Sequence, residues 1–311
     1  MLSRIQFLIA LSITLAVSFA APTSAQDAKK SNVKDDGKLR IIAFGAHPDD
    51  AEFRAGGTAA KWAQLGHHVK FVSVTNGDIG HWRMAGGPLA KRRTAEVKEA
   101  AKRLGITTQV LDIHDGELMP TLENRRTIAS LIRAWKADVV LAHRPNDYHP
   151  DHRYTGILVQ DAAFMVTVPF FCPDTEPLKK NPVFMYFPDG FKKPYPFEPD
   201  VVVSIDDVFD KKLHGIDALE SQVYEGGALG SEQTLVDRKA ADPVGRKVIL
   251  KQSWLRRDGN TATKYRAVLA EFYGDEFAKK VKTAEAFQLC EYGSRPTKAQ
   301  LRRLFPFFDK K

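Results

Sequence analysis

Strand-like and helix-like segments alternate along the chain between residues 39 and 168. Four apolar segments rich in β-branched or aromatic residues are predicted to be buried strands: 39–44, 69–74, 109–113 and 138–142. The spacing of apolar residues predicts helices at 58–65, 89–104, 124–135 and 154–168. A chain with this alternation is expected to form an α/β fold, in which a mostly parallel sheet has helices on both faces.

The chain beyond residue 168 has a weaker pattern. Its Pro-rich insert, Phe170 to Pro199, predicts loops around a strand at 183–187 and has no motif that we can assign. This insert either shapes a substrate cleft or covers the edge of the sheet. The later elements are expected to be C-terminal additions: a strand at 201–205, a helix to about 224 and, beyond about Gly226, a helix near 263–272, a strand near 286–290 and a helix at 297–304.

The first 25 residues have the features of an export signal. Arg4 lies in a short basic start, an apolar run follows over residues 5–20, and Thr23-Ser24-Ala25 offers small residues for cleavage. An uncleaved membrane anchor is the competing interpretation, but the run is short for a spanning helix and Pro22 follows it closely. We expect a signal at 1–25, a flexible linker at 26–38 and one domain at 39–311, without a transmembrane anchor after cleavage. The localisation would then be periplasmic or extracellular.

The charge and the cysteine content exclude some classes of protein. The formal net charge is +8, but the basic residues are spread along predicted helices and no nucleic-acid-binding module is recognisable, so nucleic acid is not an expected partner. Two cysteines, Cys172 and Cys290, do not make a disulfide framework; they either pair with each other or remain buried thiols. The oligomeric state does not follow from the sequence.

Three polar segments follow predicted strands of the sheet: 46–50, 75–78 and 146–152. Because ligands bind beyond the carboxyl ends of the strands in such sheets, these segments are expected to meet at one edge. The turn after the first strand carries acids instead of the glycine pattern that admits a pyrophosphate, which argues against a dinucleotide-binding enzyme.

The first of these segments contains a histidine and two acids. In Ala46-His47-Pro48-Asp49-Asp50, the turn can direct an imidazole nitrogen and the Asp50 carboxylate at one point, as a divalent metal requires. The adjacent Asp49 can then take a proton from water as a general base. The alternative is that the acids cap the following helix, which would explain one aspartate but neither the histidine nor the second acid.

The third segment ends in His149-Pro150-Asp151-His152. One of its histidines can bind the metal, while the other, when protonated, can donate a hydrogen bond to an oxyanion. The alternative is a surface loop with incidental histidines.

Several motifs in this order resemble those of the PIG-L/LmbE-like deacetylases: Ala46-His47-Pro48-Asp49-Asp50-Ala51-Glu52, Gly56-Gly57-Thr58, Thr75-Asn76-Gly77-Asp78, Arg92-Arg93-Thr94-Ala95-Glu96 and His149-Pro150-Asp151-His152. The similarity covers roughly residues 41–168. It implies a Rossmann-like fold and a zinc-dependent removal of an acetyl group from an N-acetylglucosamine-type amide.

The resemblance also implies roles for individual residues. His47, Asp50 and His152 would bind zinc, Asp49 would be the general base, and His149 would stabilise the oxyanion.

Further residues would support these five. Arg92 or Arg93 would contact the substrate, and Asp151 and His143 would orient a metal-binding imidazole from the outer shell of the site. Some family members carry a tyrosine two residues before the first histidine of the last motif, whereas this position is Asp147 here.

The sequence therefore predicts an exported metal-dependent hydrolase whose substrate is an N-acylated amino sugar or glycoconjugate. Zinc is the expected cofactor, although Fe²⁺ or another divalent ion also suits a His-Asp-His set. Two alternatives remain open: a glycan-binding protein on the same scaffold without turnover, and a metal-dependent hydrolase of another amide or ester.

Overall fold

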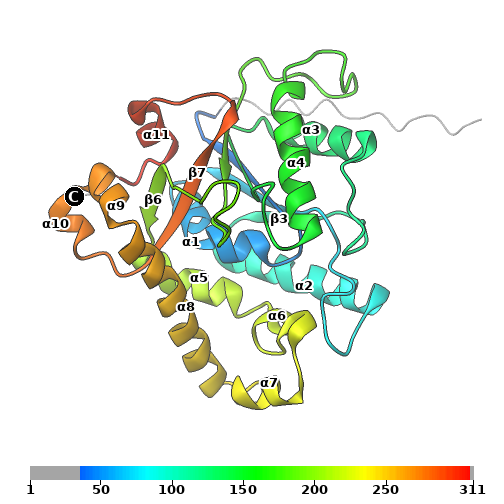
Figure 1. Ribbon diagram of the computed structural model, residues 1–311, viewed down its shortest axis with the longest axis vertical. Helices are drawn as coiled ribbons and strands as arrows, with labels where there is room; N and C mark the ends of the chain where they lie inside the picture. The colour runs from blue at the N-terminus through cyan, green and yellow to red at the C-terminus, as the bar shows by residue number, and fades with distance from the viewer. Residues whose placement is uncertain (1–35, 309–311) are drawn as a thin grey trace, which may run out of the picture. The chain divides into compact units, whose positions relative to one another are not determined.

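The computed structural model describes residues 36–308; the predicted export signal and most of the predicted linker lie outside this range. The described part of the chain contains one seven-stranded sheet (Figure 1). Its strands are β1 (Arg40–Gly45), β2 (His68–Ser73), β3 (Thr107–Val110), β4 (Val139–Ala142), β5 (Val183–Tyr186), β6 (Val201–Ser204) and β7 (Ala284–Gly293). Their order in the sheet is β3-β2-β1-β4-β5-β7-β6, and only the pairs made by β7 are antiparallel.

Helices connect and cover these strands. The first four are α1 (Asp50–Gln64), α2 (Gly86–Leu104), α3 (Leu122–Trp135) and α4 (Pro150–Met165). The later ones are η1 (Asp206–Val208), α5 (Phe209–Ile216), α6 (Glu220–Val223), η2 (Gly227–Leu229), α7 (Glu232–Asp237), α8 (Gly245–Lys264), α9 (Arg266–Tyr273), α10 (Asp275–Ala278) and α11 (Lys298–Leu304). Within residues 36–308, none of these helices combines the length and apolar content that a membrane span requires.

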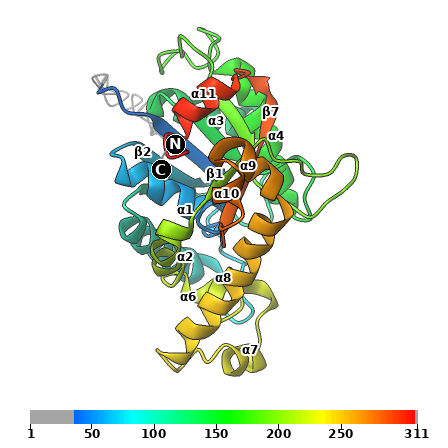
Figure 2. The same cartoon turned by 90° about the vertical axis from the view of Figure 1, so that its left-hand side faces the viewer.

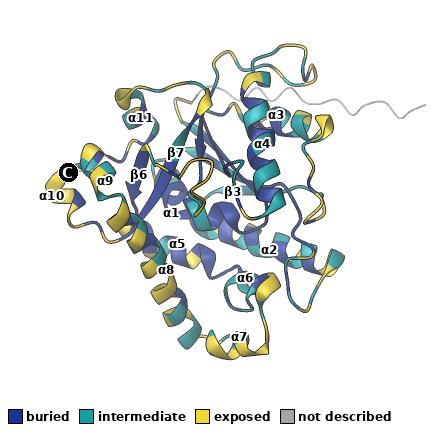
Figure 3. Ribbon diagram, in the orientation of Figure 1, coloured by how far each residue is buried: buried dark blue, intermediate teal, exposed yellow. Residues whose placement is uncertain are grey.

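The two faces of the sheet are both buried, as the predicted α/β architecture requires. Ile41 and Ala43 of β1 pack with α1 and α5 on one face, while Ile42 and Phe44 pack with α3 and α4 on the other. Successive strand residues point to opposite faces, so a strand with two covered faces is continuously apolar. Figure 3 shows this burial along the strands and the inner sides of the helices, in contrast to the exposed outer surfaces of α7 and α8.

Several elements differ from the sequence-based expectation in extent. α1 and α4 begin at Asp50 and Pro150, earlier than predicted, which places Asp50 and His152 in the first turns of their helices. The helix expected after residue 206 is divided into η1, α5 and α6. The helix expected near 263–272 is α9, and the long helix α8 that precedes it was not predicted. Figure 2 shows α8 running from the sheet region toward α7.

The topology places β1 between β2 and β4. The connection from β1 leads to β2 on one side, and the chain later crosses to β4 on the other side, so the strand order reverses at β1. In open α/β sheets the ligand site lies at this reversal, beyond the carboxyl ends of the strands. The two cysteines take no part in it: Cys172 and Cys290 are both buried free thiols.

Candidate metal centre

The turn after β1 holds His47 and Asp50 close together. The backbone N–H of His47 donates to Asp50 Oδ2 at 2.8 Å, and the N–H of Asp49 donates to the carbonyl of His47 at 2.9 Å. A Cβ at Gly45 would lie 2.8 Å from the Asp50 Cβ, so only glycine allows the strand end and the helix start to approach this closely. The first turn of α1 therefore fixes the Asp50 carboxylate against the end of β1.

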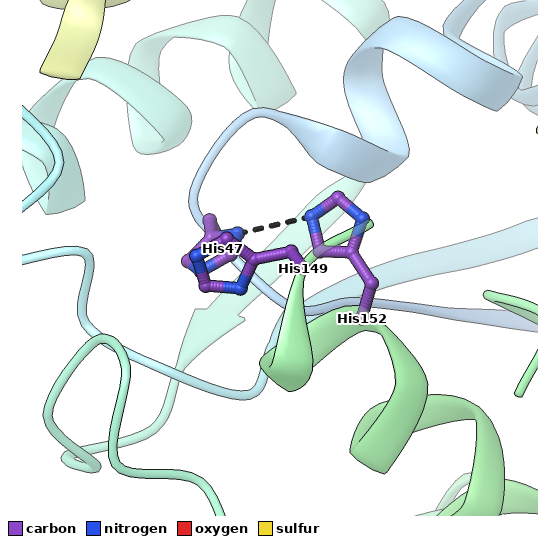
Figure 4. A group of neighbouring side chains, drawn as sticks. All are labelled: His47, His149 and His152. Atoms are coloured by element: carbon purple, nitrogen blue, oxygen red, sulfur yellow. Dashed lines mark hydrogen bonds between the residues drawn. The ribbon is translucent and has the colours of Figure 1, made fainter. Parts of the chain in front are cut away.

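The segment after β4 supplies the second histidine motif. α4 begins at Pro150, and His149 is its N-cap residue, with its Nδ1 accepting from the N–H of Asp151 at 3.2 Å. His152 lies in the first turn of α4 and is buried. Figure 4 shows His149 and His152 at the start of α4, facing His47 from the turn after β1. The two remote motifs thus meet, as the sheet topology predicted.

The side chains of these motifs form a triangle of three residues, His47, Asp50 and His152. His47 Nδ1 lies 3.3 Å from His152 Nε2 and 3.4 Å from Asp50 Oδ2, and His152 Nε2 lies 3.4 Å from the other carboxylate oxygen, Asp50 Oδ1. Ligands about 2.0–2.2 Å from a tetrahedral metal ion are roughly 3.3–3.6 Å apart, which matches the sides of this triangle. The triangle also leaves a fourth position open, as hydrolytic metal sites require.

The outer nitrogens of both histidines face carboxylates. His47 Nε2 lies 3.0 Å from Asp115 and 3.3 Å from Asp151, and His152 Nδ1 lies 3.2 Å from Asp147. These contacts place the imidazole protons on the outer nitrogens, so the inner nitrogens present lone pairs toward Asp50. With this tautomer, two imidazole nitrogens and a carboxylate can serve as ligands, and the residues present therefore fit a divalent metal.

Two of these carboxylates were not found from the sequence. Asp115 follows β3 without any motif around it, and Asp147 was noted only because it replaces a tyrosine found in some family members. The available signal was topological, because Asp115 lies beyond the end of a fourth strand at the same sheet edge. Asp151 lies 3.3 Å from His47 Nε2, where it can orient the His47 ring. It is not one of the three residues of the triangle.

Asp49 lies beside the triangle and is held by an arginine. Its carboxylate lies 3.2 Å from Arg93 Nη2, and Arg93 also donates to the carbonyls of Gly77 and Pro48 at 3.1 and 3.2 Å. Burial raises the pKa of Asp49, while Arg93 acts in the opposite direction and favours the ionised form. The arrangement holds a carboxylate with a raised pKa next to a metal-ligand set, as a general base requires.

The two arginines predicted to contact a substrate both bind protein groups. The side chain of Arg93 is only 3% exposed and contacts the carboxylate of Asp49. Arg92 binds Glu225 through two hydrogen bonds of 2.8 and 2.9 Å, and its Nε lies 3.1 Å from Glu96. In this geometry Arg93 positions the carboxylate of Asp49, and Arg92 connects α2 to the segment after α6.

His143 and His149 differ in burial and in their hydrogen bonds. His143 is buried against His152 with ring centroids 4.1 Å apart, its Nε2 accepts from the N–H of Ala46 at 3.2 Å, and burial lowers its pKa to about 4. The neutral His143 ring therefore supports His152 and the turn after β1.

His149 is half-buried and meets His47 edge to face, with centroids 4.5 Å apart. Burial, together with His47 and His152, lowers its pKa. Because His149 Nδ1 accepts a hydrogen bond from Asp151 N–H, the neutral ring carries its proton on Nε2. His149 can therefore donate to an oxyanion as a neutral ring, whereas a protonated ring was expected from the sequence.

The insert between Phe170 and Pro199 is attached to the second histidine segment. Arg144 is buried, lies 3.1 Å from an Asp189 oxygen and donates to the carbonyl of Tyr195 at 2.6 Å. Asn146 also donates to the carbonyl of Lys193. Since Arg144 and Asn146 belong to the segment that leads to His149, the insert lies beside the metal centre.

The fold and the site together define a Rossmann-like protein with a histidine–aspartate cluster that fits a metal ion at the reversal point of its sheet. The profile of the PIG-L family, described as GlcNAc-PI de-N-acetylase, matches residues 42–163. The diacetylchitobiose deacetylase of Thermococcus kodakarensis is 32% identical over 219 residues, which cover 67% of this chain and 79% of that protein. The chain belongs to the PIG-L family.

Solved structures agree with this assignment. The N,N'-diacetylchitobiose deacetylase of Pyrococcus horikoshii superposes with a TM-score of 0.58 at 25% identity, over 80% of this chain and 83% of that one. The 4-carboxy-2-hydroxymuconate hydratase of Pseudomonas putida superposes with a TM-score of 0.63 at 23% identity, over 84% and 98% of the two chains. The second similarity shows the shared fold alone, and the function must be argued from the site.

Proposed function

We propose that this protein is a metal-dependent hydrolase that removes an acetyl group from the amide of an N-acetylglucosamine-type sugar or conjugate. One observation carries the proposal: the triangle of His47, Asp50 and His152 lies directly beside Asp49, whose carboxylate Arg93 holds in place. Membership of a family of de-N-acetylases supports the reaction type. Zinc is the proposed ion, because two imidazoles and one carboxylate are a common catalytic zinc set.

The residues of the site divide the reaction between them. A divalent ion held by His47, Asp50 and His152 would supply Lewis acidity and favour ionisation of water near neutral pH. Asp49 accepts a proton from the attacking water as its oxygen bonds to the amide carbon. His149 donates from Nε2 to the carbonyl oxygen as negative charge develops there, and Asp49 returns its proton to the departing amine nitrogen.

Amine release from diacetylchitobiose and from N-acetylglucosamine, measured with the purified zinc-loaded protein, tests the proposal. Wild-type protein is expected to release equal amounts of acetate and free amine. Zinc bound in a 1:1 ratio without release from any N-acylated sugar would favour a glycan-binding protein, and release only from other amides or esters would change the substrate class. Addition of water to a carbon–carbon double bond, without acetate release, would instead indicate a hydratase.

We also propose that the enzyme acts outside the cytoplasm. The basic start at Arg4, the apolar run over residues 5–20 and the small residues before Gln26 support export. Expression in a bacterial host with an outer membrane, followed by fractionation and N-terminal sequencing, is expected to give a periplasmic protein beginning near Gln26. Full-length protein confined to the cytosolic fraction would contradict this localisation.

A further inference from the structure

Two arginines near the metal centre, Arg54 and Arg257, have a different environment from Arg92 and Arg93. Arg54 follows Asp50 by four residues in α1. Residues four apart in a helix have Cβ atoms about 5–6 Å apart on the same face. Arg54 therefore lies one helical turn from a proposed metal ligand, on the side of α1 that carries it.

Arg257 reaches the same region from α8. Its guanidinium carbon lies 4.5 Å from the ring centroid of Trp254 and 5.7 Å from that of Phe53, and these two rings are 5.1 Å apart. Phe53 directly precedes Arg54. Contact with two aromatic rings fixes the direction of the guanidinium while leaving its hydrogen-bond donors free.

The directions of the pKa shifts agree with this placement of the two charges. Burial and the positive charge of Arg54 lower the pKa of Arg257 to about 10, whereas Asp258 and Asp50 act in the opposite direction. Arg54 also lowers the pKa of Asp189, which burial raises. Arg257 thus remains charged at neutral pH, within electrostatic range of Asp50 and Arg54.

Neither guanidinium forms an ion pair or a hydrogen bond with any of residues 36–308. The acids of this region already have partners: Asp258 and Glu285 bind Lys212 at 2.8 and 2.9 Å, and Asp189 binds Arg144 at 3.1 Å. Two partly buried cations without a directly paired acid are unfavourable, because each loses hydration and repels the other. An anionic group of a ligand would remove this cost, and the planar guanidinium suits a carboxylate or a phosphate.

We propose that Arg54 and Arg257 form an anion-binding subsite beside the metal centre, and that the substrate is an N-acyl amino sugar carrying a carboxylate or phosphate group. This inference rests on the proposed deacetylase function and narrows its substrate class. Substrate recognition then lies on α1 and α8, and not at Arg92 or Arg93 of α2 as the sequence predicted.

Kinetics with neutral and anionic substrates tests the subsite. The neutral substrate is diacetylchitobiose, and the anionic ones are N-acetylglucosaminyl L-malate and N-acetylglucosamine 6-phosphate. Wild-type protein is expected to have a higher kcat/KM on at least one anionic substrate than on the neutral one. Arg54→Gln and Arg257→Gln should each lower this ratio about 10- to 100-fold, as expected for one lost charge-assisted hydrogen bond.

Arg256→Gln is the matched control, because Arg256 is the exposed neighbour of Arg257 in α8. It should leave the ratio unchanged. Equal losses on neutral and anionic substrates in the Arg54 and Arg257 variants would indicate a structural role and overturn the inference. The inference would also be overturned if wild-type protein preferred neither anionic substrate over diacetylchitobiose. In that case, amine release from diacetylchitobiose would still support the proposed function.

Binding without turnover separates the two proposals further. In the Asp49→Asn background, calorimetry should show tighter binding of N-acetylglucosamine 6-phosphate or the malate conjugate than of N-acetylglucosamine, and Arg257→Gln should remove this difference. If the preference is present but wild-type protein releases no acetate from any of these compounds, the subsite stands and the deacetylase function fails. If the preference is absent, the subsite fails whatever the activity.

Discussion

Buried charges occur in two regions of the molecule, and their arrangement differs between them. At the candidate metal centre, side-chain nitrogens and oxygens of His47, Asp50 and His152 lie 3.3–3.4 Å apart. In the C-terminal region, the ammonium group of Lys212 lies between Asp258 and Glu285, at 2.8 and 2.9 Å. The first arrangement fits an added cation, whereas in the second both carboxylates already have a cationic partner within the protein.

The second arrangement also supports the first. Glu285 of β7 accepts from the N–H groups of Gly57 and Thr58 in α1, at 2.9 and 2.7 Å, and from the Thr58 hydroxyl at 2.6 Å. α1 is the helix that begins at Asp50. The C-terminal additions therefore fix the helix that carries a metal ligand, and the following variants test whether chemistry and stability separate between the two regions.

The largest effect on activity is expected from Asp49→Asn. Asparagine cannot accept the proton of the attacking water, so kcat should fall about 10²- to 10⁴-fold. Bound zinc, measured by mass spectrometry, and the midpoint of thermal unfolding should remain close to wild type, since the triangle of ligands is intact. Asp210→Asn, at an exposed position of α5, is the control. Full activity of Asp49→Asn on a competent substrate would show that another group takes the proton.

Lys212→Met should have the largest effect on stability. It leaves Asp258 and Glu285 buried without their cation, and loss of one partner of a buried ion pair costs about 3–5 kcal/mol. Chemical denaturation measures this change in the free energy of unfolding. Lys251→Met removes the exposed pair with Asp210 and should cost less than about 1 kcal/mol. Equal losses in the two variants would mean that the buried charges do not stabilise the C-terminal region.

The sequence predicted the part of the fold in which local patterns suffice. Strands such as 39–44 are continuously apolar because both faces of the sheet are covered, and the motifs around His47 and His152 follow strand ends. α8 was missed because Gly259 and Asn260 are weak helix formers and only Leu250, Trp254 and Ala262 of its 20 residues are both apolar and buried. Its stability comes from packing against β7 and α5, which no local pattern contains.

Long-range pairing explains the other omissions. The sequence indicated a strand near 286–290, but its antiparallel insertion between β5 and β6 depends on contacts with residues far away in the chain. Asp115 and Arg257 reach the site by the same kind of contact, without a motif of their own. The proposed metal ligands could be found because they lie in short motifs, whereas the residues around them, such as Asp115, have no motif of their own.

Asp147→Asn should have a moderate effect that is confined to the metal centre. The Asp147 carboxylate lies 3.2 Å from His152 Nδ1 and orients the ring whose other nitrogen faces the metal position. Loss of such a carboxylate typically lowers metal affinity about 10- to 100-fold. Competition with a zinc chelator measures this affinity. Unchanged affinity, with an unchanged unfolding curve, would show that His152 is held by its packing against His143 alone.

The smallest effect is expected from Thr297→Ala, because Thr297 belongs to neither of the two charged clusters. Thr297 caps α11: its hydroxyl accepts from the N–H of Gln300 at 3.3 Å, and the Gln300 side chain accepts from the N–H of Thr297 at 2.7 Å. Removing such a cap costs about 1 kcal/mol of stability. Activity at room temperature should not change, because α11 contributes apolar packing through Leu301 and no charge to the site. If activity fell by more than the loss of stability explains, the C-terminal additions would also act on the chemistry. Chemistry and stability would then not separate between the two regions.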